Sequence, residues 1–157
     1  MPPVRAPRRF GGEVMAMKHK RTQAIAMVIA GALAAAGCGE SQTFVRDYNE
    51  ATKPLLELNA DAARADLSAS VRHLDGMADR LDAVDTRLRG LEPPADARDE
   101  LTRLRKAIAA SARRVRRMAS AVRERDQRRL AREAQRWARE GAELVRAEQA
   151  LKAAVQG

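Results

Sequence analysis

The stretch RGLEPPADARDE, residues 89–100, predicts a reversal of the chain between two helices. Pro93 and Pro94 prevent a helix from continuing, because proline lacks a backbone N–H and its ring clashes with the preceding turn. Before the prolines, Gly90 is expected to end a helix in the left-handed conformation that glycine adopts readily. After them, Asp96 is expected to cap the next helix. We therefore predict two antiparallel helices joined by this stretch.

On both sides of this reversal, placed at residues 90–96, apolar residues recur every three or four positions, as they do along one face of a helix. Three such stripes comprise Leu67, Val71, Leu74, Ala78, Leu81, Val84 and Leu88; Leu101, Leu104, Ile108, Ser111, Val115, Met118 and Val122; and Leu130, Ala134, Trp137, Gly141, Leu144, Ala147, Leu151 and Val155. No segment alternates with a period of two. The predicted fold is all-α, an up-down-up antiparallel bundle of three long helices with coiled-coil-like stripes. A two-helix hairpin with a kinked first helix is the alternative.

Two further breaks are less sharply marked. Residues 123–129, RERDQRR, contain no apolar side chain, and the stripe changes phase across them. This pattern predicts a turn with Asp126 as the cap of the next helix, whereas one helix over 96–155 is the alternative, since no glycine or proline enforces the turn. Pro54 bends or ends the helix that contains it, so residues 42–60 form either a short extra helix or the bent top of the first long one.

The stretch AIAMVIAGALAAAGC, residues 24–38, indicates where the protein is located. Fourteen small or apolar residues follow the cations Lys18, Lys20 and Arg21 and stop at Cys38, the single cysteine of the chain. A bilayer-spanning helix needs about 20 apolar residues, whereas about 10–14 suit the apolar region of a signal peptide. The order of cations, apolar run and small residues is that of an export signal.

The closing residues Ala35-Ala36-Gly37-Cys38 resemble the lipobox of bacterial lipoproteins, although Ala35 stands where that family usually has leucine. The resemblance implies that the signal is cut before Cys38 and that the Cys38 thiol carries a diacylglycerol. The protein would then be exported and held by this membrane anchor on the extracytoplasmic side, in the cell envelope. Cleavage after Ala36 by ordinary signal peptidase, which would release a secreted soluble helical protein, is the alternative.

The resemblance also implies a division of the chain. Residues 17–37 would be the lipoprotein signal peptide, 38–44 a tether and 45–157 the helical domain, which is similar to that of small uncharacterised helical lipoproteins. Residues 1–16 are expected to be a leader that is not translated. Residues 12–14 can be encoded by GGG-GAG-GTG, which contains a ribosome-binding sequence just upstream of two methionine codons.

Charge is unevenly distributed along the remaining chain. Residues 38–100 carry 8 basic and 14 acidic side chains, whereas residues 101–139 carry 14 basic and 3 acidic ones. Either the acidic and basic helices pair with each other, or a basic face binds an anionic lipid or a cell-wall polymer. The candidate residues for such a face are Arg113, Arg114, Arg116, Arg117, Arg128, Arg129 and Arg132.

Catalytic or metal-binding chemistry has little support in the sequence. Asp75, Asp79 and Asp82 share a helical face near His73, which is a spacing that a metal site would use, but interleaved arginines make a charged outer face the simpler interpretation. We expect no catalytic residue, no metal and no cofactor. Export and the scarcity of aromatic residues disfavour nucleic acid as a partner. The sequence therefore predicts a non-enzymatic binding or scaffold module whose partner is an envelope protein or an anionic polymer, with the oligomeric state left open.

Overall fold

The computed structural model describes residues 39–64 and 71–156, with side chains for 41–58 and 71–156. Within these ranges the chain forms four α-helices and one short 3-10 turn, and no strand. They are α1 (Gly39–Arg64), α2 (Val71–Arg89), η1 (Ala95–Ala97), α3 (Arg98–Arg123) and α4 (Gln127–Gln156). The all-α prediction is confirmed, but the arrangement of three long helices is not, because the described residues form four.

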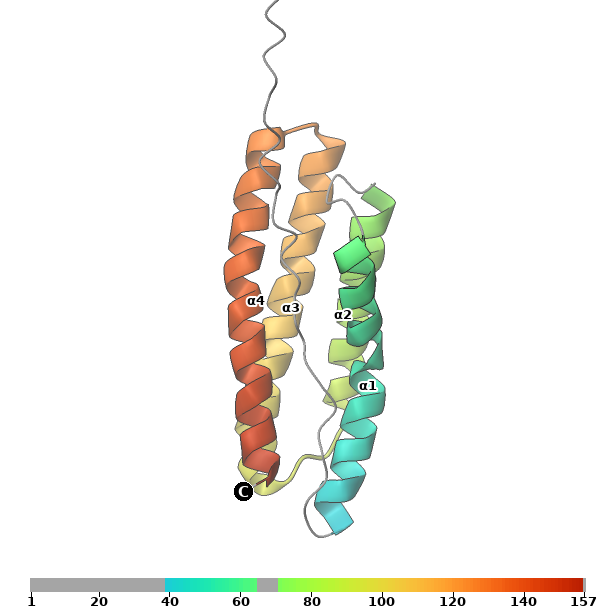
Figure 1. Ribbon diagram of the computed structural model, residues 1–157, viewed down its shortest axis with the longest axis vertical. Helices are drawn as coiled ribbons and strands as arrows, with labels where there is room; N and C mark the ends of the chain where they lie inside the picture. The colour runs from blue at the N-terminus through green and yellow to red at the C-terminus, as the bar shows by residue number, and fades with distance from the viewer. Residues whose placement is uncertain (1–38, 65–70, 157) are drawn as a thin grey trace, which may run out of the picture.

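The helices alternate in direction along an elongated bundle, as Figure 1 shows. α3 packs between α2 and α4, and α1 packs mainly on α2. One end of the bundle contains the start of α1, the α2–α3 connection and the end of α4; we call it the Gly39 end. The opposite end contains the α3–α4 turn and lies near the start of α2; we call it the Arg125 end.

The predicted stripes of α2, α3 and α4 line the core. Their largest members are almost fully buried, among them Leu74, Leu81, Leu88, Leu104, Ile108, Met118, Leu144 and Leu151. Trp137 is also buried, at 4 % exposure. Leu67 lies outside the described residues. Burial of these stripes provides the main favourable contribution to folding.

Helix α1 corrects the predicted tether over residues 39–44. These residues lie within the helix, and the Phe44 ring is 4 % exposed, so this part of the chain belongs to the bundle. Pro54 lies inside α1 without ending it. The helix is held by an apolar stripe with heptad spacing, which packs into the common core and consists of Phe44, Tyr48, Ala51, Leu55 and Leu58. Residues 42–60 are therefore part of an additional helix and not the bent top of α2.

The end of α2 differs from the predicted glycine cap. Gly90 does not adopt a left-handed φ. Instead, its N–H donates to the carbonyl of Arg87 at 3.1 Å, and the Leu91 N–H donates to the carbonyl of Leu88 at 3.3 Å. The helix thus ends in tight turns before the two prolines, which forbid its continuation.

Asp96 does not cap α3, contrary to prediction. It lies inside η1, and the residue that precedes α3, Ala97, makes no side-chain capping hydrogen bond. The Ala97 N–H donates to the carbonyl of Pro94 at 2.9 Å, so η1 satisfies part of the backbone ahead of α3. The carboxylates of Asp99 and Glu100 in the first turn of α3 complement its positive end.

The α3–α4 turn lies within the segment 123–129, where a break was predicted, and a single helix over 96–155 is excluded. The Asp126 N–H donates to the carbonyl of Ala121, and the Arg125 N–H donates to that of Val122. These two bonds form a Schellman motif, with Arg125 left-handed at φ 55°. Asp126 caps α4, because its Oδ1 accepts a hydrogen bond from the Arg129 N–H at 2.8 Å.

Gly76 offers a direct test of the α2 assignment. It lies inside the helix, and a Cβ added there would meet no atom within 4 Å. Alanine stabilises helix interiors by about 0.5–1 kcal/mol relative to glycine. We expect Gly76→Ala to raise the free energy of unfolding by this amount in urea titrations. Gly90→Ala, which lies just outside the helix, is the control and should change stability less. A Gly76→Ala protein no more stable than the wild type would contradict the helix at this position.

Candidate functional site

Aspartates of α2 face arginines of α3 along the edge that these helices share. Arg116 is 3.2 Å from Asp79 and 2.5 Å from Asp82, and hydrogen bonds with Asp82 and Asp79 raise the pKa of Arg116. Arg123 pairs with Asp75, and Asp85 accepts from Arg105 at 3.0 Å. The three aspartates considered as metal ligands are thus partners of arginines. Exposed pairs of this kind contribute little stability individually.

The opposite edge of α3 carries a more buried ion cluster. The Arg114 side chain is only 13 % exposed and lies between Glu133 and Glu140 of α4. Its Nη1 donates to Glu133 at 2.6 Å, and its Nε donates to Glu140 at 3.1 Å. Hydrogen bonding by Arg114 lowers the pKa of Glu133, while hydrogen bonds to Glu140 and Glu133 raise the pKa of Arg114. Arg114 and Glu133 are therefore both ionised at neutral pH.

Two exposed arginines flank this cluster. Arg117 of α3 and Arg136 of α4 lie 3.7 Å and 3.5 Å from Glu133, whose own side chain is 9 % exposed. The sequence analysis missed Glu133, although it lies four residues before Trp137 on the same face of α4. A carboxylate at helical spacing within an apolar stripe was the signal for a buried ionic contact.

A second buried carboxylate lies where α1 meets α4. Glu148 is 3 % exposed, and the Lys152 Nζ is 3.0 Å from its Oε1. Burial raises the pKa of Tyr48, and the negative charge of Glu148 raises it further. This arrangement explains how a charged side chain is accommodated in the core, and it was also missed.

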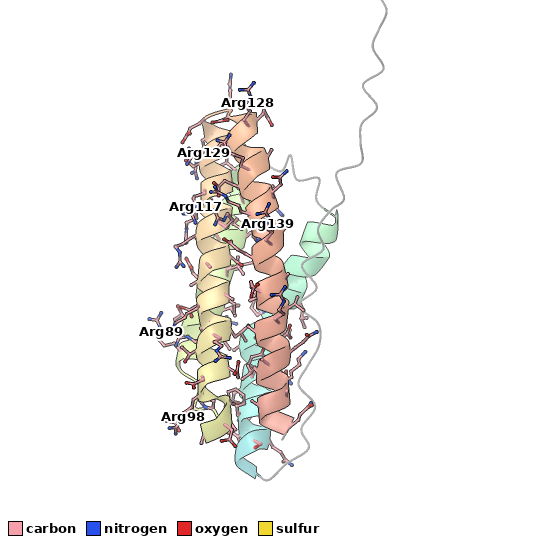
Figure 2. The ribbon with its side chains drawn as sticks, turned by 90° about the vertical axis from the view of Figure 1, so that its left-hand side faces the viewer. Arg89, Arg98, Arg117, Arg128, Arg129 and Arg139 are labelled. Atoms are coloured by element: carbon pink, nitrogen blue, oxygen red, sulfur yellow. The ribbon has the colours of Figure 1, made fainter. Side chains whose placement is uncertain are left out.

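The Arg125 end carries arginines of a different kind. Arg125, Arg128 and Arg132 are exposed, and none has an acidic partner in the part of the chain that the structure describes. The nearby Glu124 is already occupied, because it accepts hydrogen bonds from Ser120 at 2.7 Å and from Arg129 at 2.5 Å. Both hydrogen bonds lower the pKa of Glu124, and the bond from Ser120 has the larger effect. Figure 2 shows Arg128 at the extreme tip of the bundle, with Arg129 close below it.

The seven arginines predicted to form one basic face fall into two groups. Arg114, Arg116, Arg117 and Arg129 pair with carboxylates of the protein itself. Arg113, Arg128 and Arg132 are exposed and have no acidic partner among the described residues. Arg114 cannot contact an external surface, because α4 covers it. The sequence analysis did not include Arg125, which the turn places beside Arg128.

A surface hollow lies at the Gly39 end, between the first turns of α1 and the α2–α3 connection. Its lining mixes the apolar side chains of Phe44, Leu91 and Pro94 with the charged side chains of Asp47 and Arg98. Asp47 is occupied by the neighbouring Arg46 at 2.9 Å. The hollow therefore offers mixed chemistry that identifies no ligand.

Comparisons with known proteins add no family. The chain matches no family model, and no similar protein was found among the curated proteins or the solved structures. Within residues 39–64 and 71–156, none of the helices combines the length and apolarity needed to cross a membrane. In the same part of the chain, no group of three histidine, cysteine or acidic side chains is placed to hold a metal. Cys38, the predicted lipidation site, lies outside the described residues.

Proposed function

We propose that this protein is a lipid-anchored helical module of the cell envelope. In this proposal Cys38 carries the lipid and residues 39–157 form the exposed domain. The module binds a partner on the extracytoplasmic side of the membrane and catalyses no reaction. The secreted form cut after Ala36 remains the alternative.

The observation that carries the proposal is that the described bundle lies wholly on the carboxyl side of Cys38. All four helices fall within residues 39–156, beyond the expected cleavage site. Cleavage before Cys38 would therefore leave all four helices intact. It would also hold the bundle by the Gly39 end, because Gly39 follows the acylated residue directly in the sequence. Two or more acyl chains anchor a protein stably, whereas one holds it only marginally.

A binding role is favoured over a purely structural one by the charges at the Arg125 end. Most carboxylates that face α3 form ion pairs within the protein. In contrast, Arg125, Arg128 and Arg132 lack acidic partners among the described residues. Such a group of exposed guanidinium ions is suited to an anionic partner. An envelope protein with an acidic surface and an anionic polymer both meet this requirement.

Lipidation can be tested by metabolic labelling of the full chain with a radioactive fatty acid in a bacterial host. We expect the wild type to be labelled and to sediment with membranes. Cys38→Ser should lose both properties, because it removes the thiol that would accept the diacylglycerol. The expected loss is complete, since Cys38 is the single cysteine of the chain.

The matched control returns a thiol at a different position. Cys38→Ser combined with Ser41→Cys keeps one cysteine near the start of the domain but outside the run of small residues. It should remain unlabelled. Equal labelling of all three proteins, or of none, would refute the proposal. An amino terminus at Gly37 in an unlabelled, released wild type would establish the secreted alternative.

A further inference from the structure

The Arg125 end gathers three arginines that have no acidic partner among the described residues. On α3, Arg105, Arg114, Arg116 and Arg123 face aspartates of α2 or glutamates of α4, whereas Arg98 and Arg113 are exposed singly. At the Arg125 end, Glu124 is held by Ser120 and Arg129, and Asp126 accepts from the Arg129 backbone N–H. Both local carboxylates are therefore engaged within the turn. The positive charge of Arg125, Arg128 and Arg132 remains directed to the outside.

The backbone of Arg125 adds a second, independent observation. Its φ of 55° lies in the left-handed region, where the Cβ of any residue other than glycine is crowded. Glycine is the usual residue at this position of a Schellman motif. The protein thus carries an arginine where glycine would give a more stable turn, and among the described residues its side chain has no partner to compensate. Strain retained at an exposed position favours a functional role for that side chain.

The position of this end relative to Gly39 limits what the arginines can reach. Helix α3 has 26 residues, which corresponds to a length of about 39 Å at 1.5 Å per residue. The Arg125 end and the Gly39 end lie at opposite ends of the bundle (Figure 1). Electrostatic attraction is screened beyond about 8 Å at physiological salt. When Cys38 is anchored and the bundle stands away from the membrane, these arginines do not sense the head groups of that membrane.

We propose that Arg125, Arg128 and Arg132 bind a phosphate-bearing anionic polymer of the envelope, at the end of the bundle remote from the lipid anchor. This inference rests on the proposed function, which supplies the anchor and the compartment. Arg128 and Arg132 are one helical turn apart on α4, so their guanidinium groups can engage successive charges of one chain. A polymer is favoured over a single anion because each contact releases condensed counterions.

The test measures binding of fluorescent polyphosphate to the full-length mature protein in neutral detergent. The triple variant Arg125→Gln/Arg128→Gln/Arg132→Gln is compared with Arg87→Gln/Arg98→Gln/Lys106→Gln. The second set removes three exposed cations that also lack acidic partners among the described residues, but away from the Arg125 end. We expect the first set to weaken binding by roughly 100-fold at low salt, because each arginine contributes about a factor of five. The control set should weaken it by less than about threefold.

Salt dependence supplies a further readout. Three phosphate contacts predict that log K falls with log salt with a slope of roughly −2 to −3, and each arginine removed should reduce that slope by about one. Equal losses in the two triple variants would overturn the proposal, since they would indicate net charge alone. Binding of single-stranded DNA as tight as that of polyphosphate would overturn the choice of an envelope polymer.

Arg125→Gly separates a functional arginine from a structural one. We expect this variant to melt about 3–5 °C higher than the wild type, because glycine suits the left-handed position, while its polyphosphate binding falls about fivefold. Weaker binding without stabilisation would contradict the strain argument, and stabilisation with unchanged binding would remove Arg125 from the site.

Vesicles test the placement of the site. Acylated protein in phosphatidylcholine vesicles should bind polyphosphate as it does in detergent, and adding phosphatidylglycerol to the same vesicles should not compete. Competition would place the arginines against the membrane and overturn the remote position. The two proposals can fail separately. If Cys38 is not acylated, fatty-acid labelling fails, but binding of polyphosphate through the three arginines in detergent persists.

Discussion

Replacing Arg114 by alanine is expected to lower the free energy of unfolding by about 3 kcal/mol. The side chain is 13 % exposed and neutralises two glutamates of α4, Glu133 and Glu140. Without it, two carboxylates face each other beneath α3, and one of them is 9 % exposed. Removing one partner of a buried pair typically costs about 3–5 kcal/mol. We expect the lower value because Arg117 and Arg136 remain near Glu133.

The neighbouring arginines provide matched controls. Arg113→Ala removes the same side chain from the preceding position, which is exposed, and should change stability by less than about 0.5 kcal/mol. Arg117→Ala should cost at most about 1 kcal/mol, since its side chain is 48 % exposed and 3.7 Å from Glu133. Urea unfolding followed by circular dichroism gives all three values. Equal stabilities of the Arg113 and Arg114 variants would show that α4 does not cover Arg114.

The same cluster predicts a pH dependence. Hydrogen bonding by Arg114 lowers the pKa of Glu133 in the folded protein below its ordinary value of 4.5. The unfolded state therefore binds the proton more readily, and the pair stabilises the fold above pH 4.5. This contribution is lost as pH falls through the folded-state pKa. The stability difference between wild type and Arg114→Ala should accordingly shrink when unfolding is measured at progressively lower pH.

A cluster with this geometry was only partly predictable. The stripes of α2, α3 and α4 follow from spacing, because nearly all of their members are apolar and recur with the helical period. Whether a charged side chain points into the bundle or out of it does not follow from spacing. Arg113 and Arg114 are adjacent and about 100° apart around the helix axis, yet one is exposed and the other is covered. Which of them is covered depends on the direction from which α4 approaches, and no local pattern specifies it.

Helix caps show the same limit. Asp126 caps α4 as predicted, because the aspartate lies directly before the first turn. The left-handed residue that ends α3 is Arg125, which the preference for glycine at such positions does not predict. Gly90 was chosen on that rule and is not left-handed, because the α2 end is closed by tight turns instead. Asp96 was chosen on the same preference as Asp126 and does not cap α3, so residue type alone does not identify a cap.

Helix α1 was underestimated for a different reason. Pro54 predicts a bend or an end, whereas the heptad spacing of five apolar residues predicts a continuous helix. These residues are Phe44, Tyr48, Ala51, Leu55 and Leu58. A single lost backbone hydrogen bond costs less than burial of five apolar side chains contributes. The stripe was the stronger signal, and it fixes α1 in the bundle.

Replacing Leu55 by alanine is therefore expected to lower the free energy of unfolding by about 2–5 kcal/mol. Its side chain is 1 % exposed and lies in the common core. The adjacent Leu56 is 47 % exposed, and Leu56→Ala should change stability by less than about 0.5 kcal/mol. Chemical unfolding of the two variants under identical conditions gives the comparison.

The pair of substitutions isolates burial from other effects. Both delete the same atoms from consecutive positions of one helix, close to the same proline, so changes in helix propensity are matched. The difference between the two losses measures what the packing of α1 contributes at Leu55. Equal and small losses would mean that α1 does not pack on the bundle in this register. A larger loss at Leu56 would mean that α1 is rotated by about 100° about its axis relative to the bundle, so that Leu56 and not Leu55 faces the core.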